Sequence, residues 1–215
     1  MYNIYHFFEF YYNMRNVKTQ KNLVNTTLCY IEKDGCYLML HRTKKEHDYN
    51  HDKWIGIGGK FEAGESPEDC AVREVREETG LEIATGDLEY CGIVTFVDIS
   101  NEGESLPPGL SPQAVFATPP SNGGSAPVTP PEPYTEFMHI FRARKFYGVL
   151  NTNCPEGDLE WVPVSKLKEL PHWQADEIFY DFLAQNHEFF SLKCVYKNNV
   201  LVRTYLGGKP YDHWE

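Results

Sequence analysis

Three glutamates lie within the segment REVREETG, residues 73–80, at spacings that could do chemistry. Glu74, Glu77 and Glu78 occupy positions i, i+3 and i+4, so a helix would place their carboxylates on one face. Such like-charge pairs destabilise an exposed helix by about 0.2–0.5 kcal/mol each, and by more in a cleft that excludes water. A solvated acidic face is one interpretation. The other is a set of hard oxygen ligands for Mg²⁺ or Mn²⁺.

The residues around these glutamates predict one helix over residues 67–79. Ser66 suits the N-cap, Pro67 suits the first helical position and Asp69 completes a capping box. Gly80 is the residue expected just past the C-terminus of the helix. The apolar side chains that can face a core lie on an arc next to the glutamates: Ala71, Val72 and Val75.

A longer pattern contains the glutamates and begins at Gly59: GKFEAGESPEDCAVREVREETGL. It matches the Nudix box at every defining position, so the chain resembles the Nudix hydrolases. The resemblance implies an α/β fold, with an α/β/α sandwich around a mixed β-sheet. It also implies hydrolysis of a diphosphate linkage with Mg²⁺ as cofactor and Mn²⁺ as a second suitable ion, because divalent ions neutralise and align such a substrate.

The resemblance implies a role for each charged residue of the box. Glu74, Glu77 and Glu78 would hold the metal ions, and one of them would also act as general base. Glu65 and Arg73 would brace the preceding loop against the helix through an ion pair.

The same resemblance implies roles for three residues outside the helix. Gly58 would add a backbone carbonyl to the metal site. Lys60 would contact phosphate, with an ordinary solvated lysine as the alternative. Glu156, in the segment PEGDLEW, would present a further metal ligand or base from a mobile loop, with an ordinary loop acid as the alternative.

Segments outside the box resemble the subgroup that cleaves oxidised purine nucleoside triphosphates such as 8-oxo-dGTP to the monophosphate and pyrophosphate. The resemblance rests on LCYI…YLMLHR, GDLEWVP and LPHWQADEIFYDFL. Ile55 stands where some relatives have an amide that reads the base, and only Asp176 stands where some have two aspartates. Trp173 is expected either to stack on a base or to pack as a core aromatic, and Asp176 to hydrogen-bond a purine edge.

Two alternative functions stay open at the level of the sequence. One is hydrolysis of another nucleoside diphosphate derivative, such as ADP-ribose, a dinucleotide or a capped RNA end. The other is a Nudix-fold binding module without turnover, although such modules usually lose carboxylates of the box and this chain keeps them all.

The rest of the chain predicts a single domain over residues 23–207, between an N-terminal extension (1–22) and a C-terminal tail (208–215). Residues 99–133 are rich in Pro, Gly and Ser, which is typical of a disordered surface loop inserted between two strands. We expect either a passive loop or a weak docking element for other proteins. Strands are predicted at 23–31, 36–42, 88–97 and 135–146, helices near 163–170 and 174–185, and a hairpin over 191–206.

Composition limits the partners and the compartment. The net charge of −11, from 31 acidic and 20 basic residues, argues against a long nucleic acid, which normally meets a basic surface. The six cysteines are scattered, which predicts free thiols in a reducing cytoplasm. The aromatic N-terminal segment is too short for a membrane span and lacks the features of a signal peptide, so we expect a small nucleotide as partner and no membrane.

Overall fold

The computed structural model describes residues 23–45, 48–100, 134–151 and 153–212. The predictions for residues 1–22, and most of the predicted insertion at 99–133, lie outside these ranges. The strands are β1 (Leu23–Lys33), β2 (Cys36–His41), β3 (Trp54–Ile55), β4 (Leu81–Glu82), β5 (Leu88–Asp98), β6 (Tyr134–Ala143), β7 (Tyr147–Gly148), β8 (Asp158–Pro163), β9 (Phe190–Lys197), β10 (Val200–Leu206) and β11 (Lys209–Pro210). The helices are α2 (Pro67–Thr79) and α3 (Asp176–Ala184), with short 3₁₀ helices at Thr85–Asp87 and Val164–Glu169.

One mixed sheet organises the described part of the chain. Its strand order is β11-β10-β9-β5-β6-β1-β2-β3, and β8 also pairs with β2. The pairs β1–β6 and β5–β9 are parallel and the other pairs are antiparallel. The strands β4 and β7 form a separate small sheet.

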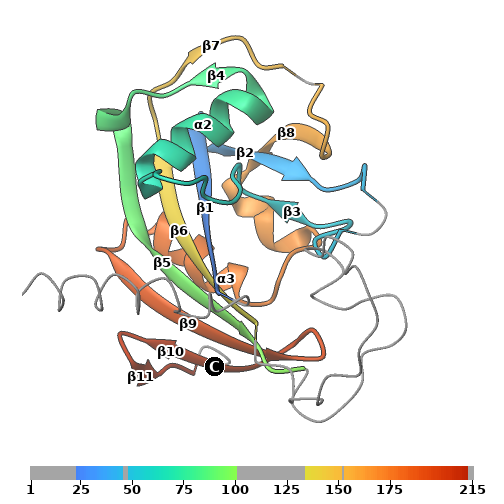
Figure 1. Ribbon diagram of the computed structural model, residues 1–215, viewed down its shortest axis with the longest axis vertical. Helices are drawn as coiled ribbons and strands as arrows, with labels where there is room; N and C mark the ends of the chain where they lie inside the picture. Colours follow the sequence, from blue (N-terminus) through green and yellow to red (C-terminus); the bar gives the residue numbers. More distant parts are fainter. Residues whose placement is uncertain (1–22, 46–47, 101–133, 152, 213–215) are drawn as a thin grey trace, which may run out of the picture.

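The two faces of the large sheet are covered by different helices (Figure 1). Successive side chains of a strand point to opposite faces, and β1 follows this rule. Cys29 and Ile31 pack in one core with Ala71 and Val75 of α2. Tyr30, between them, packs in the other core with residues of α3 such as Phe179. The predicted α/β/α sandwich around a mixed sheet is confirmed.

The helix α2 has the predicted bounds because its two ends are specified locally. The side chain of Ser66 accepts from the backbone N–H of Asp69 at 3.1 Å, and Asp69 accepts from the backbone N–H of Ser66 at 3.0 Å. Gly80 adopts a left-handed backbone with φ of 71°, and its N–H reaches the carbonyl of Arg76. Both caps satisfy backbone groups that the helix leaves unpaired.

Several element boundaries differ from the prediction. The strand predicted over 135–146 ends at Ala143, and the helix predicted near 163–170 is a 3₁₀ helix over Val164–Glu169. The helix α3 begins at Asp176, without a side-chain cap. The sheet also continues beyond position 207, because β11 pairs with β10. These ends carry no capping signal as strong as that of α2, and helix and strand ends are the least specified part of a sequence.

Two further sequence predictions concern thiols and membranes. All six cysteines are free, as predicted. In the ranges that the structure describes, no helix has the length and apolar character needed to cross a membrane.

Candidate active site

Arg73 connects the loop before α2 with the acidic face of that helix. Its Nε donates to Oε1 of Glu65 at 2.6 Å and its Nη2 donates to Oε2 of the same carboxylate at 3.0 Å. Nη2 also donates to the carbonyl oxygen of Lys60 at 3.0 Å. The hydrogen bonds from Arg73 hold the pKa of Glu65 down, at about 2. The ion pair expected between Glu65 and Arg73 is therefore present, in the two-pronged geometry that a guanidinium favours.

The same guanidinium reaches two of the three glutamates that the sequence singled out. Nη1 of Arg73 donates to Oε1 of Glu74 at 2.8 Å and to Oε2 of Glu77 at 3.2 Å. The side chain of Glu77 is 55% exposed, whereas that of Glu74 is 15% exposed. Glu74 thus faces the loop and Glu77 lies toward solvent.

Glu78 is the most buried of the three, with 7% of its surface exposed. Its Oε2 accepts from the backbone N–H of Gly58 at 3.1 Å. Burial, with smaller contributions from the charges of Glu156 and Glu74, raises the pKa of Glu78 to about 8. Burial likewise raises the pKa of Glu74. The carboxylates therefore lie where their negative charge is poorly solvated, and a cation would relieve this cost.

Two glycines let the loop approach both β1 and α2. A Cβ atom on Gly58 would lie 1.9 Å from the carbonyl oxygen of Thr27, and one on Gly59 would lie 2.5 Å from Oε1 of Glu74. The backbone N–H of Thr27 donates to the carbonyl of Gly59 at 2.9 Å, which ties the loop to β1. The GG pair is thus required sterically, and it brings backbone groups beside the carboxylates.

The donor set of this face fits a hard divalent cation such as Mg²⁺, which prefers carboxylate oxygens, waters and phosphate oxygens. Within the part of the chain that the structure describes, no three Asp, Glu, His or Cys side chains are already gathered around one point. Arg73 contacts two of the glutamates instead. A cation that bound between them would have to compete with these contacts.

Glu156 is compensated by two cations. It accepts from Nη1 of Arg42 and from Nζ of Lys45, the latter at 2.5 Å, and Arg42 also donates to Asp48 at 2.6 Å. The carboxylate is close enough to Glu78 to raise the pKa of that residue. Its place beside the acidic face agrees with the prediction, but its role as a ligand or base stays a prediction.

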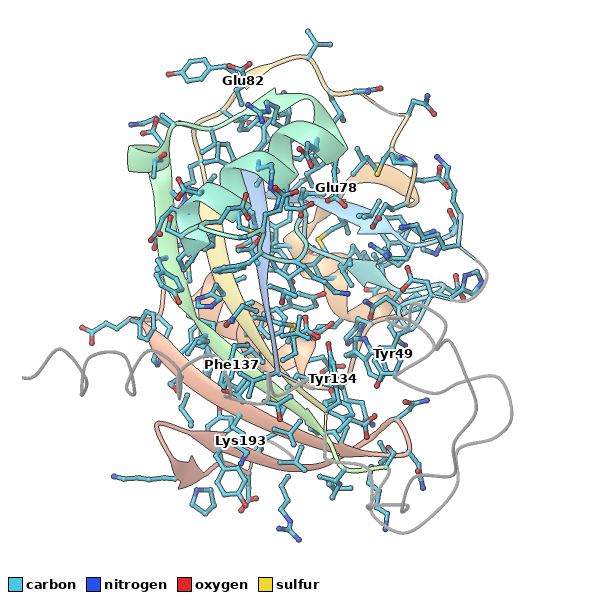
Figure 2. The ribbon with its side chains drawn as sticks, viewed as in Figure 1. Tyr49, Glu78, Glu82, Tyr134, Phe137 and Lys193 are labelled. Atoms are coloured by element: carbon cyan, nitrogen blue, oxygen red, sulfur yellow. The ribbon has the colours of Figure 1, made fainter. Side chains whose placement is uncertain are left out.

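A pocket lies next to this face and shares Gly58 and Gly59 with it. Residues of four strands line it, and those of β5, β6 and β9 alternate along the strand: Thr26, Thr27 and Leu28 of β1, Val94, Phe96 and Asp98 of β5, Tyr134, Glu136 and Met138 of β6, and Cys194 and Tyr196 of β9. Figure 2 labels two of the lining residues, Tyr49 and Tyr134, and shows Glu78 above them. The pocket also contains the four substrate-binding candidates from the sequence: Ile55, Lys60, Trp173 and Asp176.

The ring of Trp173 is already engaged by its neighbours. Tyr49 stacks on it with a centroid distance of 4.8 Å, and the ammonium of Lys53 lies 4.5 Å from the ring centroid. Its Nε1 donates to the side chain of Asn50 at 2.8 Å. A base that stacked on Trp173 would have to displace Tyr49 or Lys53, so the stacking role stays a prediction.

Asp176 lies at the start of α3 and is 8% exposed. Its Oδ2 accepts from the backbone N–H of Trp173 at 3.1 Å, and burial raises its pKa to about 7. Within the described ranges, its Oδ1 accepts no hydrogen bond. One oxygen of a buried carboxyl group is therefore available to a ligand.

Sequence reasoning missed Glu136, the acid in the middle of β6. The signal was present in TEFMHIF, because Glu136 interrupts an otherwise apolar alternation with Tyr134 and Met138 on the same face. Thr26 Oγ1 donates to one carboxylate oxygen at 2.7 Å and Tyr134 Oη to the other at 2.9 Å. Burial raises the pKa of Glu136.

Comparison with known proteins gives the class to which this arrangement belongs. The model of the NUDIX domain matches residues 22–183. The uncharacterised Nudix hydrolase YvcI of Bacillus subtilis is 27% identical over 161 residues, which cover 75% of this chain and 79% of YvcI. An oxidised purine nucleoside triphosphate hydrolase of Danio rerio is 26% identical over 160 residues, which cover 74% of this chain and 80% of the relative.

Solved structures agree on the fold. The mutator protein MutT of Bacillus halodurans superimposes with a TM-score of 0.63 at 22% sequence identity, over 87% of this chain and 99% of its own. The chain belongs to the Nudix family. The resemblance predicted from the box is confirmed, and the box lies on the α2 face and the loop before it.

Proposed function

We propose that this protein hydrolyses a nucleoside triphosphate, in particular an oxidised purine nucleotide such as 8-oxo-dGTP, to the monophosphate and pyrophosphate. The observation that carries the proposal is that the acidic face of α2 lies directly beside the pocket. The buried carboxylates of Glu74 and Glu78 meet a pocket with aromatic walls at Gly58 and Gly59. A flat heterocycle suits the pocket, and a phosphate chain suits the acidic face once cations are bound.

The reaction adds water across one bridging P–O bond of the triphosphate. One new P–O bond forms with the water oxygen, the bridging bond breaks toward pyrophosphate, and a proton is released. Mg²⁺, when bound, would supply charge neutralisation and alignment of the phosphates. Glu74, Glu77 and Glu78 are the residues that would hold it, with a backbone group of Gly58.

The chain's own residues prepare this chemistry in three ways. Arg73 fixes the loop and the helix relative to each other through Glu65 and the carbonyl of Lys60. Lys60 lines the pocket beside Gly59, where its ammonium would contact a phosphate oxygen. A buried glutamate with a raised pKa, such as Glu78, is suited to accept a proton from water near neutral pH.

The relatives favour an oxidised purine over other leaving groups. The similar proteins of Danio rerio and Mus musculus are both oxidised purine nucleoside triphosphate hydrolases, and both alignments cover more than two thirds of each chain.

The test is a steady-state substrate panel with Mg²⁺ or Mn²⁺. We expect kcat/KM for 8-oxo-dGTP to exceed that for dGTP and for ADP-ribose, dinucleotide and NAD-capped RNA substrates. Efficient hydrolysis of one of the latter compounds, with little release of pyrophosphate from 8-oxo-dGTP, would refute the substrate assignment. Absence of turnover with every compound would favour a binding module.

A further inference from the structure

The pocket wall formed by β6 carries a carboxylate that the reaction does not require. Glu136 is on the face of the sheet opposite to α2, between the pocket residues Tyr134 and Met138. The carboxylates of α2 lie at the other end of the pocket, beyond Gly58 and Gly59. Glu136 is half-buried, and a carboxylate so poorly solvated in a largely aromatic and apolar wall is costly unless something uses it.

The carboxylate is held in one orientation. Thr26 Oγ1 donates to one oxygen at 2.7 Å, from the parallel neighbour β1, and Tyr134 Oη donates to the other at 2.9 Å. The two donated hydrogen bonds oppose the rise in pKa that burial causes, and they leave each oxygen with a further lone pair. Glu136 is therefore preorganised to accept hydrogen bonds.

The other acids of the pocket are differently engaged. Asp48 accepts from the guanidinium of Arg42, and Asp98 accepts from the backbone N–H of Ser100 at 2.8 Å and from its hydroxyl. In the described ranges, no ion pair joins Glu136 to a cationic side chain, although Lys60 is near enough to influence its pKa. Unlike Asp48, Glu136 is not paired with a guanidinium, so its carboxylate oxygens are open to the donors of a ligand.

We propose that Glu136 is a specificity-determining residue that selects ligands whose heterocyclic base offers N–H donors to the β6 wall. The assignment rests on the proposed function, because it places the base in this pocket and the phosphates at α2. With Asp176 also lining the pocket, β6 and α3 each present a carboxyl group to a ligand. Such a pocket repels anionic groups and favours a base rich in N–H groups.

Binding of nucleoside monophosphates without metal tests the role of Glu136 apart from turnover. Isothermal titration would compare 8-oxo-dGMP and dGMP with the monophosphate of unsubstituted purine deoxyriboside, whose base has no N–H donor. The substitution Glu136→Gln keeps the size of the side chain and replaces one acceptor by a donor. We expect Kd for the two guanine ligands to rise by roughly 10- to 100-fold, as for hydrogen bonds to a charged group, and Kd for the donor-free ligand to change less than about twofold.

Two controls separate recognition from folding. Glu160→Gln makes the same charge change on the exposed side of β8, away from the pocket, and should leave all three Kd values unchanged. Thermal unfolding of Glu136→Gln should give a midpoint no lower than that of the wild type, because the amide keeps the size of the side chain and has no charge to desolvate. Equal loss of affinity for all three ligands, no loss for any, or a wild type that binds none of them would overturn the proposal.

The same experiment distinguishes this proposal from the proposed function. A wild type that hydrolyses no triphosphate, yet binds guanine monophosphates in a way that depends on Glu136, would refute the function and support the specificity role. A wild type that hydrolyses 8-oxo-dGTP, and whose preference for guanine ligands survives in Glu136→Gln, would support the function and refute the specificity role.

Discussion

The acidic face of α2 and the pocket next to it both contain buried or half-buried carboxylates, but the neighbours of these carboxylates differ. On α2, Glu74 and Glu78 lie one turn apart, burial raises the pKa of both, the charge of Glu74 raises that of Glu78 further, and Arg73 donates to Glu74. In the pocket, Glu136 and Asp176 come from different elements, and hydroxyl or backbone N–H groups hold each of them. The first arrangement suits a cation and the second suits a neutral ligand with hydrogen-bond donors.

The largest expected effect comes from the α2 face. Glu78→Gln keeps the shape of the side chain but removes a buried charge that a divalent cation would use. Loss of several kcal/mol of charge stabilisation corresponds to a fall in kcat of about a thousandfold. Pyrophosphate release with saturating Mg²⁺ measures it.

Glu82→Gln is the matched control for that substitution. Glu82 is an exposed glutamate on β4, at the far end of the molecule from the pocket (Figure 2). Its substitution should leave kcat unchanged. Equal activity of Glu78→Gln and Glu82→Gln would show that the buried carboxylate has no part in turnover.

A second prediction concerns the pH dependence of stability, and it tests a residue of the pocket without involving the α2 face. Burial raises the pKa of Asp176 from 3.8 to about 7. The protonated form therefore stabilises the folded state fully below about pH 4, and this contribution is lost as the pH rises through 7. Asp176→Asn should remove that loss, which amounts to about 2–3 kcal/mol between pH 5 and pH 8.

Urea unfolding at several pH values measures this difference. The exposed Asp158 supplies the control, since Asp158→Asn should keep the pH profile of the wild type. A profile for Asp176→Asn that also matched the wild type would mean that Asp176 titrates as an ordinary exposed acid.

A third prediction concerns the close approach of the loop to α2. A Cβ atom on Gly59 would collide with the carboxylate of Glu74, which is the movable end of a side chain. Gly59→Ala should therefore displace Glu74 and lower kcat by about tenfold or more, with the fold retained. The kinetics of Gly86→Ala provide the comparison, because a Cβ atom on Gly86 meets nothing within 4 Å. If both variants retained full activity, the position of Glu74 would not matter.

The smallest expected effect concerns the brace between loop and helix. Arg73→Lys keeps the positive charge but cannot contact Glu65 and the carbonyl of Lys60 together. We expect a loss of about 1 kcal/mol in the free energy of unfolding, one net hydrogen bond, measured by urea denaturation. Arg203→Lys on the exposed side of β10 should change it by less than about 0.5 kcal/mol. If Arg73→Lys also changed the free energy of unfolding by less than about 0.5 kcal/mol, the contacts of Arg73 with Glu65 and Lys60 would add no stability.

The same comparison explains what could be predicted from the sequence. The bounds of α2 and its acidic face followed from Ser66, Asp69, Gly80 and the spacing of the glutamates, because caps and helical periodicity are local. The pocket depends on which strands become neighbours. Glu136 meets Thr26 only because β6 pairs with β1 in parallel, 110 residues apart in the chain.

The contacts of Trp173 and Glu156 were equally non-local. Tyr49 and Asn50 reach Trp173 across 124 and 123 residues, and Arg42 reaches Glu156 across 114 residues. No pattern in one segment could reveal that these side chains were already engaged. The sequence therefore supported the chemistry of the helix better than the selectivity of the pocket.

The most direct test of the account is to identify the products formed from 8-oxo-dGTP in ¹⁸O-labelled water with Mg²⁺. With the base in the pocket and the phosphate chain at the α2 face, we expect equal amounts of 8-oxo-dGMP and pyrophosphate, with one ¹⁸O atom incorporated per turnover. Formation of the nucleoside diphosphate and orthophosphate, or no reaction while another nucleotide is cleaved, would contradict it.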